Sequence, residues 1–240
     1  VARLALITGG TRGIGAAVAR ALKDAGHPVV VNYHADEACA AAFTAESGIP
    51  ALKWDVSNGD ACRAGSRPSR PSTARWRSSS TMPGTVSDNK FENMTDDQWQ
   101  RVVRVNLDSV FYMSKAVYPG MMGRGWGRII QIGSMNGQAG QLNQVNYVAA
   151  KAGMHGFTKA LAQEGAKYGI TVNTVAPGYV DTYLMRNMPE KIVQKIVDKS
   201  PIRRMGYEEE VAHAVLFLID DKAAWTTGST ITMNGGTHMY

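Results

Sequence analysis

Tyr147 and Lys151, four residues apart in the stretch NYVAAK, have the residue types and the spacing of a pair that could move a proton. On a helix these side chains would be neighbours on one face. An ammonium beside a phenol favours the phenolate, so we expect Lys151 to lower a tyrosine pKa that starts near ~10. Tyr147 could then act as a general acid toward a carbonyl oxygen. Such pairs also occur on solvated helix faces, so a site is indicated only if other residues join the pair.

Two further polar residues occur where they could complete such a site. Ser134 ends the apolar run RIIQIGS, and the carboxyl ends of parallel strands line the crevice in which open α/β sheets bind ligands. Its hydroxyl could donate to the same carbonyl oxygen. Asn106 interrupts the apolar face of the helical stretch RVVRVNLDSV, and a buried amide needs hydrogen-bond partners. Each residue alone has an ordinary structural interpretation, whereas their joint occurrence in this order indicates carbonyl chemistry.

The stretch TGGTRGIG places a glycine-rich turn between an apolar run and a helical pattern. Backbone N–H groups at such a helix N-terminus can hold a pyrophosphate. After the second apolar run, where an acid would bind the ribose hydroxyls of NAD, the chain has Asn32, Tyr33 and His34. A guanidinium in the turn suits a 2′-phosphate, so NADP is favoured over NAD, although Asp36 and Glu37 follow closely. The predicted cofactor contacts of this region are Gly9, Thr11, Arg12, Gly13, Ile14, Gly15 and Tyr33.

These residues need elements that hold them, and the sequence supplies an alternation of apolar β-rich runs and helical patterns. Strands are predicted at residues 3–8, 27–33, 50–56, 127–134, 169–178 and 229–235, and helices at 14–26, 36–48, 95–122, 147–168 and 208–219. Alternation of this kind implies parallel strands with right-handed crossovers. We therefore predict one α/β domain over residues 1–240, a doubly wound Rossmann sheet of mostly parallel strands with helices on both faces. A seventh strand, just before Gly84, is implied only by the family resemblance described below.

The totals limit the class of protein. A chain of 240 residues with 44% hydrophobic content can bury one good-sized core. The sequence has neither a run of 18 apolar residues nor a signal-peptide pattern, which predicts a cytoplasmic protein without a membrane partner. Cys39 and Cys62 fit neither a disulfide framework nor a metal cluster, so no metal is expected. The net charge of +6 would ordinarily favour an anionic partner, and much of it lies between residues 63 and 77.

The motifs together resemble those of the short-chain dehydrogenase/reductase family. TGGTRGIG, Asp55-Val56, Asn106, Ser134, the Tyr147–Lys151 pair and PGYVDT follow the family order across nearly the full chain. The resemblance implies that Ser134 orients a carbonyl, that Tyr147 donates the proton, and that Lys151 lowers the tyrosine pKa while holding the nicotinamide ribose. It implies that Asn106 holds a water in the proton relay. Further contacts to NADPH are implied for Asp55, Val56, Gly84, Pro177, Gly178, Val180 and Thr182.

Within that family, stretches such as NGQAGQLNQVNY and TGSTITMNGG are most similar to reductases that act on acetoacetyl-CoA in polyhydroxybutyrate synthesis. This similarity implies an acyl-CoA substrate, reduced from the 3-oxoacyl to the (R)-3-hydroxyacyl thioester. Gln141, Gln144 and Tyr179 would face the acyl group, residues 183–206 would form a substrate lid, and the assembly would be a homotetramer. The alternatives are a reductase of 3-oxoacyl groups on acyl-carrier protein, which would share every catalytic residue, and a non-catalytic NADP-binding protein.

One stretch departs from the family pattern. Around residues 66–84 the family has an amphipathic helix and then a buried strand that ends Asn-Asn-Ala-Gly, whereas this chain has SRPSRPSTARWRSSSTMPG. Two prolines inside a helix and Arg-Ser-Ser-Ser in a central strand conflict with both propensity and burial. The distance from Asp55 to Gly84 nevertheless matches the family, so we infer that nothing is inserted.

A shift of reading frame accounts for this stretch. Codons for residues 66–83 can be chosen so that reading one base earlier gives IAAVEAVHGPVEVLVNNA, which restores the helix, the strand and the motif in register. We therefore interpret residues 66–83 as frame-shifted, by one base lost and one gained in the DNA or in its sequencing, and expect an ordinary helix and central strand there. The restored frame removes four arginines and adds two glutamates, which brings the formal charge from +6 to about zero. Nucleic-acid binding, which would need those arginines, then loses its main support.

Overall fold

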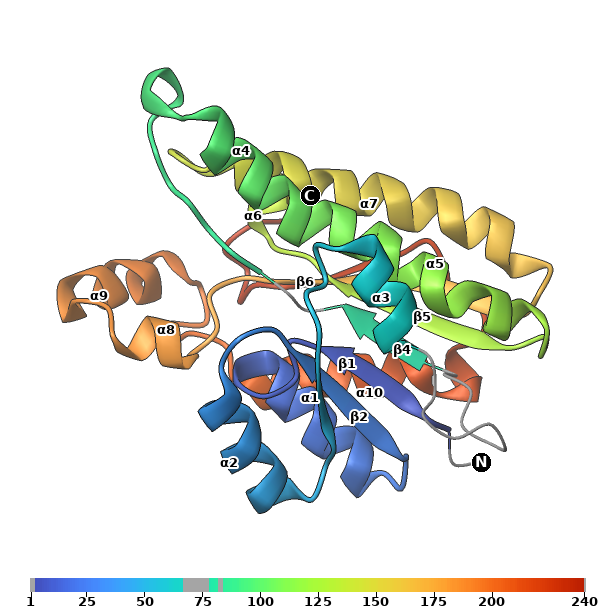
Figure 1. The fold of residues 1–240 in the computed structure, drawn as a ribbon. Helices are drawn as coiled ribbons and strands as arrows, with labels where there is room; N and C mark the ends of the chain where they lie inside the picture. Colours follow the sequence, from blue (N-terminus) through green and yellow to red (C-terminus); the bar gives the residue numbers. More distant parts are fainter. Residues whose placement is uncertain (1–2, 67–77, 82–83, 240) are drawn as a thin grey trace.

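Seven parallel strands form a single sheet in the order β3-β2-β1-β4-β5-β6-β7 (Figure 1). The structure is a computed structural model that describes residues 3–66, 78–81 and 84–239. The strands are β1 (Ala5–Thr8), β2 (Val29–Tyr33), β3 (Ala51–Lys53), β4 (Ser78–Thr81), β5 (Gly127–Ile132), β6 (Ile170–Pro177) and β7 (Thr230–Met233). The predicted doubly wound sheet is confirmed, and the strand order reverses between β1 and β4, where such folds bind ligands.

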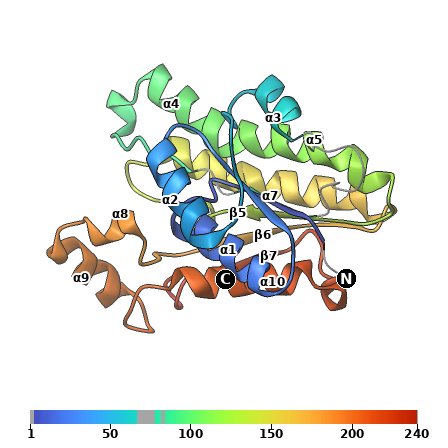
Figure 2. The same cartoon turned by 60° about the horizontal axis from the view of Figure 1, so that its bottom comes forward.

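Helices cover both faces of the sheet, as Figures 1 and 2 show from two directions. One face carries α1 (Gly13–Asp24), α2 (Glu37–Ser47) and α10 (Glu208–Ile219). The other carries α3 (Gly59–Gly65), α4 (Asp96–Val103), α5 (Ser109–Met122) and α7 (Val145–Ala166). The short helices η1 (Phe91–Asn93), α6 (Asn136–Ala139), α8 (Tyr183–Arg186) and η3 (Asp221–Ala223), together with α9 (Glu190–Lys199), lie in the connections. Of these, α8 and α9 project beyond the end of the sheet at which the strands finish.

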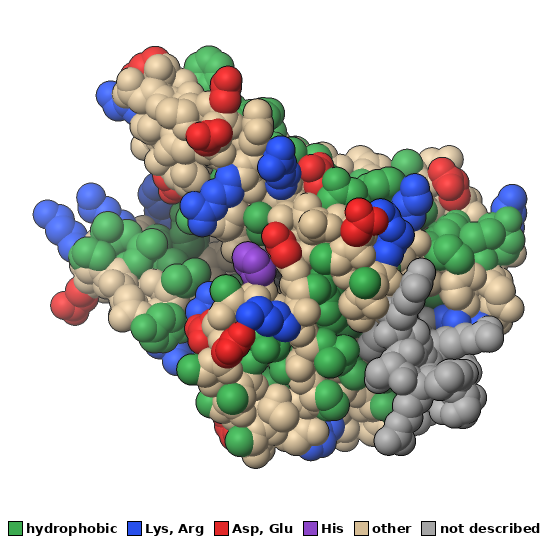
Figure 3. All heavy atoms as spheres, viewed as in Figure 1, with side chains coloured by type: hydrophobic (Ala, Val, Ile, Leu, Met, Phe, Trp, Pro, Cys, Tyr) green, Lys and Arg blue, Asp and Glu red, His purple; other side chains and the backbone are tan. Residues whose placement is uncertain are grey.

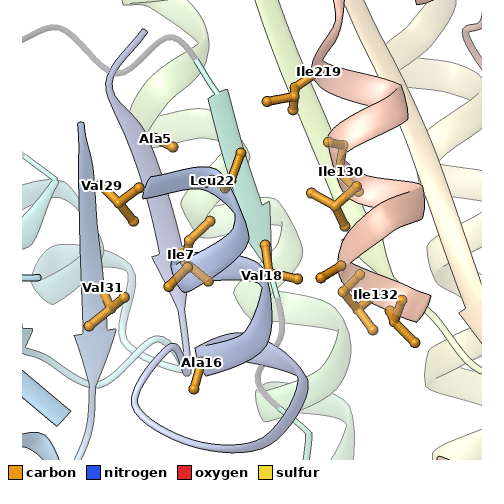
Figure 4. Close-up of a cluster of buried hydrophobic side chains, with 14 of the residues drawn as sticks. Ala5, Ile7, Ala16, Val18, Leu22, Val29, Val31, Ile130, Ile132 and Ile219 are labelled. Atoms are coloured by element: carbon orange, nitrogen blue, oxygen red, sulfur yellow. The ribbon is translucent and has the colours of Figure 1, made fainter. Parts of the chain in front are cut away.

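The sequence explains this layering. Every residue of β5 and β6 is buried, as expected for parallel strands covered on both faces. Figure 4 shows one of the two apolar layers, in which Ile7, Val18, Val31, Ile130 and Ile219 come from five different elements and point toward one another. Burial of such side chains contributes about 1.5–3 kcal/mol each, so this layer fixes α1 and α10 against the sheet.

The helix predicted over residues 95–122 is interrupted. Thr95 and Gln98 form the expected capping box at its start, with Gln98 N donating to Thr95 Oγ1 at 3.2 Å. A π-helical turn, η2 (Arg104–Asp108), then separates α4 from α5. The extra residue of a π-turn changes which side chains face inward, and Asn106 in this turn is fully buried. The prediction of one continuous helix was therefore wrong at the position that matters for the site.

The expected central strand is present in the stretch that departs from the family pattern. Residues 78–81 form β4, which pairs in parallel with β1 on one side and with β5 on the other. Residues 67–77 and 82–83 lie outside the described residues, and with them most of the helix expected before β4; the described helix α3 ends at Gly65. The position of the strand in the sheet is thus confirmed.

Candidate active site

The turn between β1 and α1 is shaped to receive a bulky anion. Gly9 and Gly13 have positive φ angles of 62° and 59°, which glycine adopts without strain. A Cβ on Gly15 would lie 2.2 Å from the carbonyl oxygen of Gly9, so a side chain cannot be accommodated there. The first turn of α1 carries no acid, which leaves its N-terminal N–H groups and the positive end of its dipole available to a pyrophosphate. The turn therefore fits the nucleotide that the motif predicts.

Contacts from α2 hold the turn in place. Arg12, the residue before α1, lies with Nη1 3.5 Å from Asp36 Oδ2, and the two side chains are 68% and 50% exposed. Asp36 also caps α2, because its Oδ1 accepts from Cys39 N at 3.0 Å. Cys39 Sγ in turn donates to the carbonyl oxygen of Thr11 at 3.5 Å. Arg12 thus stands at the glycine turn with an acidic partner already in place.

The residues that follow β2 and β3 surround the expected adenosine position. Asn32 is buried and donates from Nδ2 to the carbonyl of Trp54 at 2.9 Å, so it joins β2 to β3 and does not face a ligand. Tyr33 is half-buried at the end of β2. His34 Nε2 lies 3.8 Å from Asp55 Oδ2, while Asp55 Oδ1 accepts from Ser57. The predicted contact Asp55 thus has one carboxylate oxygen bonded to Ser57 and the other near the exposed His34 ring.

Ser134, Tyr147 and Lys151 are brought together as predicted. Ser134 follows β5 by two residues, and Tyr147 and Lys151 lie in the first two turns of α7. Lys151 is only 3% exposed, and its Nζ donates to the carbonyl of Ile132 at 2.8 Å, which places it 5.6 Å from the centre of the Tyr147 ring. A hydrogen bond between Ser134 and Tyr147 favours the phenolate and so opposes a rise in the tyrosine pKa.

The electrostatics differ from the expectation in one respect. Burial raises the pKa of Tyr147, the Ser134 hydrogen bond lowers it, and the charge of Asp88 raises it further. Burial lowers the pKa of Lys151 to about 8. Lys151 is not among the groups that shift the pKa of Tyr147, so the lowering expected from its charge stays a prediction. The Lys151 ammonium donates to the carbonyl of Ile132, lies 5.6 Å from the centre of the Tyr147 ring, and is itself costly to charge in a buried position.

Asn106 has an unused acceptor that faces the site. Its Nδ2 donates to the carbonyls of Thr85 and Val102, both at 2.9 Å, which orients the amide. Its Oδ1 is buried and has no hydrogen-bond partner among the described residues. A Cβ on Gly84 would lie 3.7 Å from that oxygen. A buried acceptor without a partner is the feature expected of a residue that holds a water, which agrees with the relay role inferred for Asn106.

Sequence reasoning missed two residues that join the loop after β4 to the start of α7. Gln144 Nε2 donates to Asp88 Oδ2 at 2.9 Å, and Asn136 Nδ2 donates to Gln144 Oε1 at 3.0 Å. Asn136 N also donates to Ser134 Oγ at 3.1 Å. Asn136 therefore connects the predicted substrate residue Gln144 to Ser134, and Asp88 connects Gln144 to the loop after β4. The position of Asp88 four residues after Gly84, just beyond a strand end, was the available signal.

The remaining predicted residues lie around the same edge of the sheet. Pro177 ends β6, and its carbonyl accepts from Met135 N at 2.8 Å, next to Ser134. The segment from Gly178 to Thr182 leads to α8, with Val180 buried and paired with Gly206. Gln141 is exposed. The remaining predicted cofactor residues also lie by strand ends or in the glycine turn, with Ile14 half-buried, Val56 buried and Gly84 exposed.

Figure 3 shows a hollow between the lobe that carries η1 and α4 and the lobe that carries α8 and α9. The strands end at this hollow. The residues there are suited to hold a dinucleotide on the glycine turn and to protonate an oxygen bound by Ser134 and Tyr147. Within the described part of the chain, no group of three or more His, Cys, Asp or Glu is placed to hold a metal. No helix in those same residues is long and apolar enough to cross a membrane.

Comparisons with known proteins identify the family. The family model described as enoyl-(acyl carrier protein) reductase matches residues 9–238. An acetoacetyl-CoA reductase of Rhizobium meliloti is 49% identical over 98% of both chains, and one of Shinella zoogloeoides is 47% identical over the same shares. A 3-oxoacyl-[acyl-carrier-protein] reductase of Pseudomonas aeruginosa is 41% identical over 99% of this chain and 98% of its own. The chain belongs to the short-chain dehydrogenase/reductase family of nicotinamide-dependent oxidoreductases.

Proposed function

We propose that the protein reduces acetoacetyl-CoA to the (R)-3-hydroxyacyl thioester with NADPH. The observation that carries this proposal is the arrangement of Tyr147, Ser134 and Lys151 at one strand end, in a chain that is 43–49% identical to four acetoacetyl-CoA reductases. NADPH, when bound, supplies the hydride. The glycine turn and α1 would hold its pyrophosphate, and Arg12 its 2′-phosphate.

The side chains then divide the work on the substrate. Ser134 and Tyr147 hydrogen-bond the 3-oxo oxygen, which orients it, and Tyr147 Oη gives up its proton to that oxygen. Burial of the Tyr147 side chain raises its pKa and thus keeps the phenol protonated until the 3-oxo oxygen of the substrate becomes basic. Lys151 and a water on Asn106 Oδ1 would return a proton to the phenolate. Asp88 and Gln144 position the wall of the substrate site opposite Ser134.

A second candidate is reduction of the same acyl group on acyl-carrier protein, which the 41% identity to the Pseudomonas aeruginosa enzyme supports. The two candidates share all the residues that touch the reacting oxygen. They differ in the carrier, so NADPH oxidation with acetoacetyl-CoA should be compared with the same acid on a carrier protein. A higher kcat/KM with acetoacetyl-CoA supports the first proposal, and the reverse supports the second.

Removal of the proton donor tests the chemistry itself. Tyr147→Phe should remove most turnover, because general acid catalysis contributes roughly 100-fold to 10,000-fold to a rate. Binding of NADPH, measured by nucleotide fluorescence, should change little. Turnover retained in this variant would refute the role of Tyr147, and absence of turnover in the unaltered protein with either carrier would favour a non-catalytic, NADP-binding protein.

A further inference from the structure

A carboxylate borders the glycine turn that is shaped for a pyrophosphate. A Cβ on Gly13 would lie 3.8 Å from Glu208 Oε1, so Glu208, the first residue of α10, lies beside the turn between β1 and α1. Burial raises the pKa of Glu208, the charge of Arg186 lowers it, and the charges of Glu209 and Asp181 raise it. A pyrophosphate on the turn would therefore meet an acidic border, where its own charges need a cation.

Arg186 of α8 is a cation at this border. Among the charged side chains that shift the pKa of Glu208, Arg186 lowers it most. Its Nε lies 3.1 Å from Asp181 Oδ1, and its Nη2 donates to the carbonyl oxygen of Asp181 at 3.0 Å. The Arg186 side chain is 64% exposed, and ion pairs of this exposure contribute little to stability. Arg186 can thus exchange Asp181 for a stronger anion at small cost.

The chain also brings Arg186 to the end of the sheet that carries the glycine turn. Arg186 lies one helical turn after Thr182, a predicted contact of the coenzyme, and its backbone N donates to the carbonyl of Thr182 at 3.0 Å. Figure 1 shows α8 beyond the end of the sheet at which the strands finish, and the glycine turn follows β1 at that same end. Arg186 and the turn therefore border the same side of the candidate site.

The two other arginines near the turn have different positions. Arg12 pairs with Asp36 and is the residue expected at a 2′-phosphate, while Arg20 pairs with Glu46 farther along α1. The N-terminus of a helix carries the equivalent of about half a positive charge, which offsets only part of the negative charge of a pyrophosphate. A guanidinium donates charge-assisted hydrogen bonds to phosphate oxygens, so Arg186 is suited to neutralise the remainder.

We propose that Arg186 leaves Asp181 when a coenzyme binds and holds its pyrophosphate, and that Glu208 limits the affinity for the coenzyme by repelling the same group. The inference rests on the coenzyme of the proposed function and is independent of the acyl carrier. NADPH and NADH share the pyrophosphate, whereas only NADPH carries the 2′-phosphate. Loss of Arg186 should therefore weaken the binding of both coenzymes alike, in contrast to the loss expected for Arg12.

The test measures the Kd of NADPH and of NADH by nucleotide fluorescence at one ionic strength. Arg186→Gln should raise both Kd values about tenfold, the equivalent of ~1.4 kcal/mol. Arg186→Lys keeps the charge and should recover most of that loss. Glu208→Gln should lower both Kd values by roughly 1.4-fold to fivefold, because one repulsive charge is removed.

Arg203→Gln is the matched control. Arg203 belongs to the same segment of residues 183–206, is exposed, and donates from Nη1 to the carbonyl of Asp198 near the end of α9 at 2.9 Å. This variant removes the same charge from the same lobe, so it measures long-range electrostatics alone, and both Kd values should change by less than about twofold. Thermal unfolding shows whether each variant is folded.

The inference is overturned if folded Arg186→Gln changes the two Kd values no more than Arg203→Gln does, or if only the Kd of NADPH rises. The part assigned to Glu208 is overturned if Glu208→Gln does not lower the two Kd values. If the unaltered protein binds neither coenzyme, the proposed function fails and the inference fails with it. If both coenzymes bind but neither carrier thioester is reduced, the proposed function fails while the inference is still decided by the Kd values.

Discussion

In the proposed function Asp36 would compete with the 2′-phosphate of NADPH for Arg12, so neutralising Asp36 should change coenzyme preference. The two side chains form an ion pair at 3.5 Å in which both are at least half exposed. Pairs of this exposure contribute about 0.2–1 kcal/mol. Arg12 would have to give up this interaction to bind a 2′-phosphate, so we expect Asp36 to weaken NADPH binding by roughly 1.4-fold to fivefold.

Asp36→Asn removes the charge while keeping the cap of α2, because asparagine is as good an N-cap as aspartate. The Kd of NADPH should fall by that factor. The Kd of NADH should not fall, since its ribose hydroxyls gain nothing from loss of a carboxylate. Arg12→Gln should act in the opposite direction, because a hydrogen bond to a charged group contributes about 1.5–3 kcal/mol, which is roughly 10-fold to 150-fold in Kd.

Both coenzymes can be titrated by the change in nucleotide fluorescence at one fixed ionic strength. Glu46→Gln is the matched control, because Arg20 and Glu46 form a 2.9 Å ion pair between the same two helices but away from the glycine turn. Equal changes in the two Kd values in Asp36→Asn, or an equal loss of NADH and NADPH binding in Arg12→Gln, would show that Arg12 does not bind the 2′-phosphate.

Three further outcomes are expected. Reduction consumes a proton, and burial lowers the pKa of Lys151 to about 8. Because kcat/KM reports the free enzyme, it should fall about tenfold per pH unit above pH 8. A kcat/KM that stays constant up to pH 9.5 would contradict this expectation. Phe111 on α5 is 46% exposed, and Phe111→Asp should convert the tetramer expected from the family resemblance to smaller species in sedimentation; an unchanged size would show that the assembly does not use this face of α5. The masses of peptides over residues 63–90 should match the restored frame. Detection of a peptide containing SSSTMPG would rule out a sequencing error as the cause of the unusual stretch.

The elements that sequence reasoning placed correctly are those with a strong local pattern. The helix predicted at Glu208–Ile219 is α10 without change, and the helix stopped by Gly48 ends there with that glycine at φ 65°. In both cases the apolar spacing and the terminating residue agree with the tertiary environment. The buried strands β5 and β6 were equally clear, because continuous apolar runs bounded by glycine suit a parallel sheet.

The features that were missed depend on contacts between distant residues. A π-turn adds one residue to a helix without a sequence signal, so one continuous helix was predicted over residues 95–122 even though Asn106 interrupts its apolar face. The link from Asp88 to Gln144 joins residues 56 apart, which spacing along the chain does not reveal. The tyrosine pKa was predicted from its charged neighbour alone, whereas burial is the largest influence on it. The residue types and their spacing in the sequence therefore predicted which side chains lie close together, but not how deeply the site is buried.

Strand β4 shows how far the rest of the fold constrains a segment. The residues Ser78–Thr81 have little tendency to form a strand, yet they pair with Ala5–Thr8 on one side and with residues 128–131 on the other. Without β4, the facing edges of β1 and β5 would carry unpaired backbone groups in the middle of a covered sheet, which is costly. The restored frame would place Val-Leu-Val at positions 78–80, the composition expected of a central parallel strand. The topology and the reading-frame hypothesis thus point independently to the same strand, and the loop after it carries Gly84 and Asp88 to the active site.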